Sequence, residues 1–282
     1  RDELKQYQLQ ERLKIKSLSK LRFFLGDVRD KDRFKLALDG VDIVIHAAAL
    51  KQVPAAEYNP FEFIKTNVFG AQNIIEACME SNVKNVLALS TDKASSPINL
   101  YGATKLCSDK LFISAQNTIG KKNIKFSVVR YGNVFGSRGS VFPKFLSLKN
   151  SQSFPVTDPF MTRFNISLNE SVEFVLNSLI KQKGGEIFVP KLSSYKITDL
   201  CKAMNPRKRI QIIGIRPGEK IHEELISISE SKMTADMGNY YIILPPQFRE
   251  TSLKYNIKRI KFAPKNFTYN SGSNPIFLGV NE

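Results

Sequence analysis

The sequence has no tryptophan, two histidines, three cysteines and no long apolar run. Cys78, Cys107 and Cys201 are too few and too widely spaced for a disulfide framework or a zinc site. Their odd number is typical of a reducing compartment, and we interpret all three as small apolar residues. No segment approaches the roughly 20 apolar residues of a membrane helix. The charged N-terminus has no signal-peptide core, so we expect a soluble, cytoplasmic protein without a membrane partner.

Acidic residues are also scarce. The chain has 42 Lys and Arg against 26 Asp and Glu, a net charge of +16. Such a balance favours anionic ligands through long-range attraction. The basic residues are spread along the chain, without a basic arm, a zinc pattern or an RNA-recognition signature. We therefore expect a phosphorylated small molecule as the partner, and no nucleic acid.

The third absence is a glycine-rich turn near the N-terminus. A dinucleotide-binding fold begins with a strand, a glycine turn and a helix, because the pyrophosphate lies against backbone at a helix N-terminus. Here the first glycine is Gly26, at the end of a predicted strand, and there is no initiator methionine. We expect a βα unit of more than ~30 residues to be missing before Arg1. Its absence would leave unpaired strand edges and impair cofactor binding.

What is present is an alternation of strand-length apolar runs and helix-length amphipathic runs. This pattern predicts an α/β fold: a Rossmann-like doubly wound parallel sheet, without its first βα unit, and a smaller C-terminal subdomain. Residues 1–140 are expected to form the incomplete NADP-binding domain, and residues 141–282 mainly a substrate-binding subdomain and tail. The expected strands are 21–26, 41–46, 83–89, 124–131, 186–189, 210–213 and 240–244. The expected helices are 31–38, 61–80, 102–118, 167–182 and 198–204, and 266–274 is expected to be a surface loop.

Two short segments carry candidate chemistry. Asp92 and Lys93 follow a predicted buried strand, and Tyr101 and Lys105 open the next helix. Tyr and Lys four residues apart share one helix face. The ammonium is then expected to lower the pKa of the phenol, so that Tyr101 can take a proton from a sugar hydroxyl. Tyr-x-x-x-Lys alone is as typical of an ordinary helical pair, but a strand end just upstream is where α/β sheets bind ligands.

A larger set of segments resembles the inverting UDP-N-acetylglucosamine 4,6-dehydratases, a branch of the extended short-chain dehydrogenases/reductases in the polysaccharide biosynthesis group. The similar segments run through nearly the whole chain. They are Arg1–Lys5 (RDELK), Phe24–Asp30 (FLGDVRD), His46–Lys51 (HAAALK), Ala56–Pro60 (AEYNP), Ser90–Ala94 (STDKA), Pro97–Lys110 (PINLYGATKLCSDK), Val129–Gly139 (VRYGNVFGSRG), Met161–Phe164 (MTRF) and Arg216–Lys220 (RPGEK).

The resemblance implies a lyase mechanism. Tyr101, assisted by Lys105, would deprotonate the C4 hydroxyl while hydride passes to NADP, and Thr91 belongs to the same catalytic set. Lys93 would then remove the C5 proton as a neutral amine, which requires burial and nearby positive charge to keep it neutral. Asp92 would protonate the departing C6 hydroxyl. Related retaining enzymes carry Asp-Glu at this pair, so Lys93 indicates inversion at C5, in glycan or pseudaminic-type sugar synthesis.

The resemblance also implies binding residues and no metal. For the cofactor they are Arg1, Asp2, Glu3, Leu4, Asp27, Val28, Ala47, Lys51, Tyr101 and Lys105. An Arg near the second strand favours NADP over NAD. For UDP-N-acetylglucosamine they are Lys51, Asn133, Val134, Phe135, Gly136, Ser137, Arg138, Val141, Thr157, Met161, Arg163 and Arg216, and the Arg forks suit a diphosphate. His46 is expected to be structural. Gln52 and Asn165 depart from residues common in the family, His and an aromatic.

Three other interpretations stay open. A UDP-sugar C4 epimerase or reductase needs no proton abstraction at C5, so Asp92 and Lys93 would then be incidental. A truncated, inactive remnant would still bind UDP-sugar or a partner subunit. A basic nucleic-acid binder predicts steeply salt-dependent DNA affinity. From the resemblance we also expect a homo-oligomer.

Overall fold

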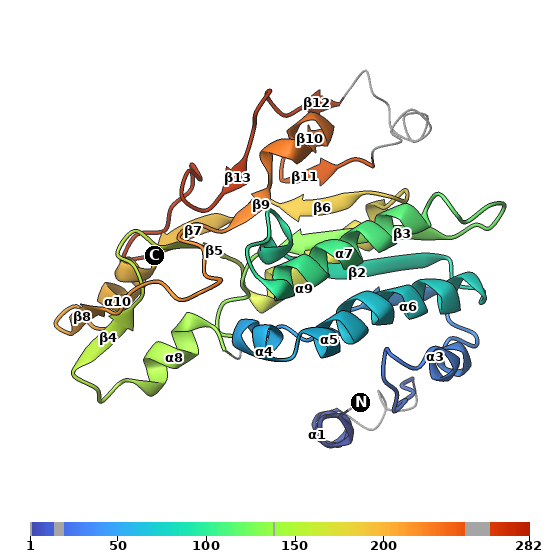
Figure 1. Ribbon diagram of the computed structural model, residues 1–282, viewed down its shortest axis with the longest axis horizontal. Helices are drawn as coiled ribbons and strands as arrows, with labels where there is room; N and C mark the ends of the chain where they lie inside the picture. The colour runs from blue at the N-terminus through green and yellow to red at the C-terminus, as the bar shows by residue number, and fades with distance from the viewer. Residues whose placement is uncertain (1, 14–19, 138, 246–259) are drawn as a thin grey trace.

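The computed structural model describes residues 2–13, 20–137, 139–245 and 260–282. Its centre is a seven-stranded sheet (Figure 1), of which the first four strands are parallel and the rest antiparallel. The predicted parallel-dominated α/β sheet is thus confirmed. In spatial order the strands are β1 (Ile43–His46), β2 (Asn85–Thr91), β3 (Lys125–Tyr131), β6 (Ile187–Pro190), β11 (Tyr240–Ile243), β10 (Thr234–Asp236) and β12 (Lys261–Phe262).

Helices cover both faces of this sheet. Val86 of β2 points into a core shared with α6 (Gly70–Met79) and α7 (Leu100–Ala115), whereas its neighbour Leu87 points into a second core beneath α9 (Leu168–Lys181). Successive strand residues face opposite sides, so a strand buried on both faces is apolar along its whole length. The doubly wound arrangement therefore follows from the composition of the central strands.

The helix predicted over 61–80 is divided into three parts. α5 (Pro60–Phe63) continues into a π-helical turn, η1 (Ile64–Phe69), and then into α6. The buried side chain of Asn67, within η1, accepts from the Leu50 amide at 2.8 Å and donates to the Leu50 carbonyl at 2.9 Å and to Thr104 Oγ1 at 3.0 Å. The π turn thereby fixes the loop that follows β1 against α7.

The predicted strand at 21–26 is wrong. The segment makes no strand pairing among the described residues, and Leu21 and Leu25 are exposed. A strand satisfies its backbone groups through a neighbour, and β1 is itself an outer strand with Ile43 and Ile45 exposed. Apolar residues without a neighbouring strand therefore did not make a strand here.

Among the described residues, two helices lie before β1. α1 (Glu3–Arg12) has no buried residue, and α3 (Lys31–Ala37) packs on α6. Lys31 of α3 forms ion pairs with Glu76 at 2.5 Å and with Glu80 at 2.8 Å. The helix predicted at 31–38 is confirmed.

A smaller group of elements lies at one end of the sheet (Figure 1) around a core that includes Phe145, Phe154 and Met161. It pairs β4 with β8 and β5 with β7, and adds two helices. The large sheet contains strands from before and from after residue 140. The substrate-binding role of residues 141–282 stays a prediction. The bounds are β4 (Ser153–Val156), β8 (Arg209–Ile212), β5 (Thr162–Asn165), β7 (Ser193–Lys196), α8 (Val141–Ser147) and α10 (Ile197–Met204).

The polar segment 266–274 is not a surface loop. Its β13 (Tyr269–Asn270) pairs with β9 (Glu224–Ile226), and Ser271 is fully buried. The Tyr269 hydroxyl accepts from the Leu192 amide at 2.7 Å. Polar side chains are buried here because each finds a hydrogen-bond partner, which composition alone does not indicate.

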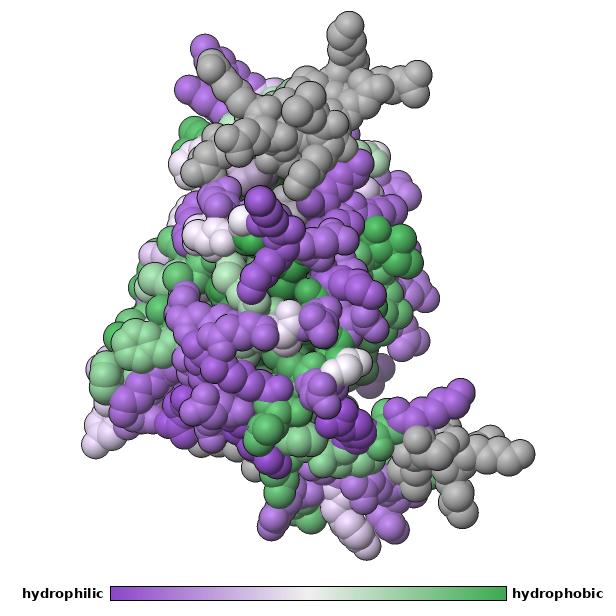
Figure 2. Space-filling model, turned by 90° about the vertical axis from the view of Figure 1, so that its right-hand side faces the viewer, coloured by the Kyte–Doolittle hydropathy of each residue, from purple (hydrophilic) through white to green (hydrophobic). Residues whose placement is uncertain are grey.

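Surface and solvent-facing features are mixed. On the face in Figure 2, hydrophobic residues form separate patches among hydrophilic ones.

Among the helices that the structure describes, none has the length and apolar character needed to cross a membrane. The described ranges also hold no cluster of three His, Cys, Asp or Glu side chains arranged for a metal. Cys78 and Cys201 are buried as expected, whereas Cys107 is exposed.

Candidate active site

A cavity of about 630 Å³ lies where the parallel strands end. Ala47 follows β1, Thr91 ends β2 and Asn133 follows β3, and all three line the cavity with residues of the smaller subdomain. Ligands of open α/β sheets bind at the carboxyl ends of the strands. The candidate site is therefore where the topology predicts it.

Tyr101 and Lys105 stand on the first turns of α7, which Asn99 caps by accepting from the Gly102 amide at 2.8 Å. Both side chains are buried at the cavity wall. Lys105 Nζ donates to the Leu89 carbonyl at 2.9 Å. Burial raises the pKa of Tyr101 to about 12, and the cation that opposes this rise is Lys93. In this structure the pKa of the phenol is raised, and Lys93 rather than Lys105 is the cation with the largest lowering effect on it.

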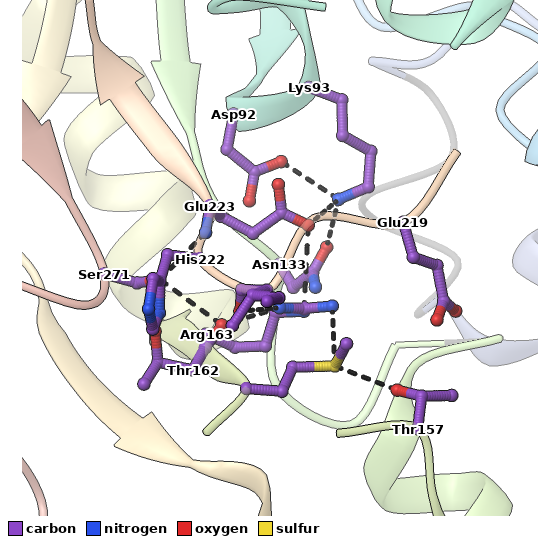
Figure 3. Close-up of polar contacts among 12 residues, drawn as sticks. Asp92, Lys93, Asn133, Thr157, Thr162, Arg163, Glu219, His222, Glu223 and Ser271 are labelled. Carbon is purple, nitrogen blue, oxygen red and sulfur yellow. Dashed lines mark hydrogen bonds and ion pairs between the residues drawn. The ribbon is translucent and has the colours of Figure 1, made fainter. Parts of the chain in front are cut away.

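Lys93 lies on the short 3-10 turn η2 (Asp92–Ala94) and points into the cavity (Figure 3). Its Nζ lies 3.1 Å from Asp92 Oδ1, 3.2 Å from Glu223 Oε1 and 3.4 Å from Asn133 Oδ1. Burial by itself lowers the pKa of Lys93, but the two carboxylates outweigh it and the net pKa is raised. The raised pKa favours the ammonium form of Lys93. The expected excess of positive charge around Lys93 is not found, because two carboxylates contact it, so Lys93 has to give up a proton before it can act as the C5 base.

Asp92 is buried behind Lys93. Burial raises the pKa of Asp92 and the charge of Glu223 adds to this, while Lys93 opposes it. Thr91 Oγ1 donates to Asp92 Oδ1 at 2.9 Å, and Oδ2 has no hydrogen-bond partner among the described residues. A Cβ at Gly132 would meet Phe164 Cβ at 2.8 Å and lie 3.5 Å from Oδ2. Glycine at this position leaves space next to the carboxyl group.

Three of the predicted substrate-binding residues are connected through the sulfur of Met161. Met161 Sδ accepts from Thr157 Oγ1 at 3.2 Å and from Arg163 Nη2 at 3.0 Å. Arg163 Nη1 donates to the carbonyls of Thr162 at 2.7 Å and Ile221 at 3.1 Å. These bonds orient the Arg163 guanidinium at the cavity wall. Arg216 is half exposed at the cavity, 3.4 Å from Glu219 Oε1.

Most predicted site residues line the one cavity. They are Ala47, Lys51, Thr91, Lys93, Tyr101, Lys105, Asn133, Val134, Phe135, Ser137, Val141, Thr157, Met161, Arg163 and Arg216. Arg1 and Arg138 lie outside the described residues. Seven predicted residues do not line the cavity: Asp2, Glu3, Leu4, Asp27, Val28, Asp92 and Gly136. Asp2 caps α1, and Asp27 pairs with Arg29 at 2.9 Å.

Among the other residues of the cavity wall, sequence reasoning missed three with a polar group near the candidate acid and base: Tyr195, Lys220 and Glu223. Lys220 Nζ donates to the Ser95 carbonyl at 2.7 Å, and burial lowers its pKa. Glu223 contacts Lys93 across 130 residues of chain. The available signal was the position of Lys220 and Glu223 at or just after the segment Arg216–Lys220.

The sheet and this cavity together define a Rossmann-type α/β enzyme of the short-chain dehydrogenase/reductase class. The chain belongs to the polysaccharide biosynthesis protein family, whose model matches residues 1–245. The resemblance recognised in the sequence is confirmed.

Individual relatives cover the chain almost completely. It is 51% identical to a UDP-N-acetylglucosamine 4,6-dehydratase (inverting) of Campylobacter jejuni, over 100% of this chain and 86% of the relative. It is 43% identical to a UDP-glucose 4-epimerase of Rickettsia bellii, over 86% and 72%. The crystal structure of Pen from Bacillus thuringiensis is 36% identical with a TM-score of 0.89, over 100% of this chain and 84% of that one.

Proposed function

We propose that this protein dehydrates UDP-N-acetylglucosamine to a UDP-4-keto-6-deoxy sugar with inversion at C5. The observation that carries the proposal is that Lys93 and Tyr101 line one cavity and that the buried Asp92 contacts Lys93 Nζ at 3.1 Å, so a base, a hydroxyl-activating group and an acid lie together. The 51% identity to the Campylobacter dehydratase supports the same substrate. The product would feed glycan or pseudaminic-type sugar synthesis.

The proposed cofactor is NADP, which when bound accepts hydride from C4 and returns it to C6. Ala47, Lys51, Tyr101 and Lys105 line the cavity where its nicotinamide end would lie. Lys105, which is buried and holds the Leu89 carbonyl, is suited to reach a ribose hydroxyl. The ammonium groups of Lys51 and Lys105 and the hydroxyl of Tyr101 supply hydrogen-bond donors for the ribose hydroxyls and phosphates of such a cofactor. The choice of NADP over NAD rests on the expected role of Arg1.

Tyr101 is proposed to take the proton of the C4 hydroxyl. Its pKa of about 12 in this structure is set by burial, so the phenol needs stabilisation of its anion to act as a base. The nearby Thr91 hydroxyl lowers the pKa of Tyr101, and it would stabilise the anion by turning its one proton from Asp92 Oδ1 to the phenolate. Oxidation at C4 then acidifies the proton on C5.

The Asp92 and Lys93 pair can carry out the elimination without an external proton. If one proton moves along the 3.1 Å contact from Nζ to Oδ1, the ammonium becomes an amine and the carboxylate becomes an acid. The amine takes the C5 proton and the acid protonates the departing C6 oxygen, which leaves as water. The pair returns to ammonium and carboxylate, so the proton count balances. The raised pKa of Asp92 favours the acid form.

The diphosphate is proposed to bind near Arg163 and Arg216, since guanidinium forks match phosphate oxygens. The loop after β3 adds Phe135, whose ring stacks on Phe142 with centroids 4.6 Å apart. These groups would hold the nucleotide while the sugar reaches Lys93.

The decisive experiment runs the reaction in heavy water with the protein expressed from its entire coding sequence. We expect UDP-N-acetylglucosamine to yield a 4-keto-6-deoxy product with one solvent deuterium at C5 and inverted configuration, measured by NMR and mass spectrometry. A product with no deuterium at C5 would rule out the dehydration.

A second candidate is a UDP-sugar C4 epimerase, favoured by the 43% identity to the Rickettsia enzyme. Epimerisation leaves the C6 hydroxyl in place and takes no deuterium at C5. UDP-glucose and UDP-N-acetylglucosamine assayed in parallel separate the two activities, because only dehydration lowers the product mass by that of one water.

We further propose a homo-oligomer located in the cytoplasm, with residues 141–282 supplying most of the substrate contacts. The three cysteines form no disulfide, which supports a reducing compartment. Light scattering coupled to size exclusion would test the oligomeric state, and a monomer mass at micromolar concentration would contradict it.

A further inference from the structure

A second buried carboxylate, that of Glu223, contacts the proposed base Lys93. Glu223 precedes β9, and its side chain has about 4% of its surface exposed. Its Oε1 lies 3.2 Å from Lys93 Nζ, almost the same distance as Asp92 Oδ1 on η2. Figure 3 shows the Lys93 ammonium between the two carboxylates, with the Asn133 amide oxygen as the third acceptor. Three oxygens of the protein therefore surround the ammonium: those of Asp92 and Asn133 accept hydrogen bonds, and that of Glu223 forms an ion pair.

Each carboxylate keeps one buried oxygen without a partner among the described residues, Glu223 Oε2 and Asp92 Oδ2. An unpaired buried carboxylate oxygen is costly, and a site that retains two of them beside one ammonium is not explained by stability. In the proposed elimination Asp92 gives up a proton, whereas Glu223 neither takes nor gives one. Glu223 is also anchored, because its backbone amide donates to Ser271 Oγ at 2.9 Å.

Other charged groups face this cluster from each neighbouring element. Arg163 Nε of β5 lies 3.7 Å from Glu223 Oε1. Lys220, in the loop before β9, and Tyr101 of α7 also act on the pair electrostatically. Two carboxylates thus face the cations Lys93, Arg163 and Lys220. Glu223 is the carboxylate of this group that the proposed reaction leaves unchanged.

We propose that Glu223 is a positioning residue that fixes Lys93 Nζ beside Asp92 and sets the pH range in which this pair holds its one working proton. The inference rests on the proposed dehydration. Elimination requires one proton shared by Asp92 and Lys93. With two protons the pair has no base, and with none it has no acid.

The charge of Glu223 affects both ends of that range in the same direction. A nearby negative charge favours the protonated form of any group, so it raises the pKa of Asp92 and of Lys93 together. Removing this charge lowers both pKa values. The acid limb of the activity profile, where Asp92 loses the second proton, and the alkaline limb, where Lys93 loses the last one, both move to lower pH.

The test compares the pH dependence of C5 deuterium incorporation in the unmodified protein and in Glu223→Gln, which keeps the side-chain size and an acceptor oxygen for Lys93. We expect both limbs to shift down by about one to three pH units. The matched control is Glu224→Gln, the same charge change one residue along, where the carboxylate accepts from Ser95 and Ser96 instead. Its limbs should stay in place. A Glu223→Gln profile with unmoved limbs would overturn the proposal.

A second measurement does not depend on the reaction. NMR of the protein labelled with ¹³C at lysine Cε gives the titration of Lys93, assigned by its missing signal in Lys93→Arg. Its midpoint should fall in Glu223→Gln and stay in Glu224→Gln. If the Lys93 midpoint falls in Glu223→Gln but the unmodified protein has no dehydratase activity, only the proposed function is refuted. If the unmodified protein is active but the Lys93 midpoint does not fall in Glu223→Gln, the role of Glu223 is refuted. If Glu223→Gln does not fold, Glu223→Asp, which keeps the charge but shortens the reach, should lower the rate and leave the limbs unmoved.

Discussion

At the scale of single residues, two buried lysines of one cavity have opposite electrostatics. Burial lowers the pKa of Lys105, with Asp109 opposing, whereas Asp92 and Glu223 raise the pKa of Lys93. Burial alone therefore does not decide the charge of a lysine; the number of carboxylates in contact does.

The role of Lys93 predicts a split between two half-reactions. In Lys93→Ala, oxidation at C4 should survive, visible as absorbance of reduced nicotinamide in a single turnover. Elimination should fall by at least about 10²-fold, the usual contribution of a positioned acid or base. Lys93→Arg, which keeps the charge but does not release its proton, should behave alike. Intact dehydration in either variant would show that another base acts at C5.

At the scale of elements, the site depends on how closely α7 approaches η2. A Cβ at Gly102 would lie 2.2 Å from the Lys93 carbonyl oxygen and 3.1 Å from its carbonyl carbon. Both are backbone atoms and have no rotamer with which to move away. The glycine next to Tyr101 therefore sets the distance between the helix that carries Tyr101 and the turn that carries Lys93.

Gly102→Ala tests this contact. Alanine normally stabilises a helix by up to about 1 kcal/mol relative to glycine, but overpacking costs about 1–3 kcal/mol. We expect a net loss of stability in urea unfolding, together with lower dehydratase activity. Gly26→Ala is the control, because its added Cβ would meet a flexible Arg33 side chain at 3.4 Å. A Gly102→Ala protein as stable as the unmodified one would contradict the close approach.

At the scale of the whole molecule, one buried arginine joins distant segments. Arg130 of β3 is fully buried, with Nη2 at 3.3 Å from Asp109 of α7 and Nη1 at 3.0 Å from Glu230 of η3 (Ile228–Met233). Ser90 donates to the same Asp109 carboxylate at 2.8 Å. The network ties the C-terminal third of the chain to β2, the strand that directly precedes the candidate acid and base.

Removing this cation should destabilise the entire fold. Arg130→Met leaves two buried carboxylates without their partner, and breaking a buried pair in this way costs about 3–5 kcal/mol. Urea unfolding followed by fluorescence or circular dichroism measures the loss. Lys84→Met, which removes an exposed pair with Asp42, is the control and should cost at most about 1 kcal/mol. A loss for Arg130→Met no larger than for Lys84→Met would show that the network does not hold the molecule together.

Local patterns determined much of this protein without reference to its fold. The doubly wound sheet follows from apolar central strands, and Tyr101 and Lys105 share a face because four residues make about one helical turn. Asp92 and Lys93 are placed by the end of β2, directly before them. Structural features that depend on a few neighbouring residues were therefore predictable from the sequence. The predicted strand at 21–26 failed because a strand also needs a neighbour, which the pattern does not contain.

Tertiary structure alone decided the charge of the site. Glu223 and Glu224 are adjacent and identical in type, yet the first contacts Lys93 and the second contacts Ser95 and Ser96. Nothing in the local sequence distinguishes them, since their difference arises from a contact across 130 residues. The same contact adds to the effect of Asp92 and raises the pKa of Lys93, where the sequence suggested an amine. Electrostatic energies depend on distance in space and on burial, and both are properties of the folded chain.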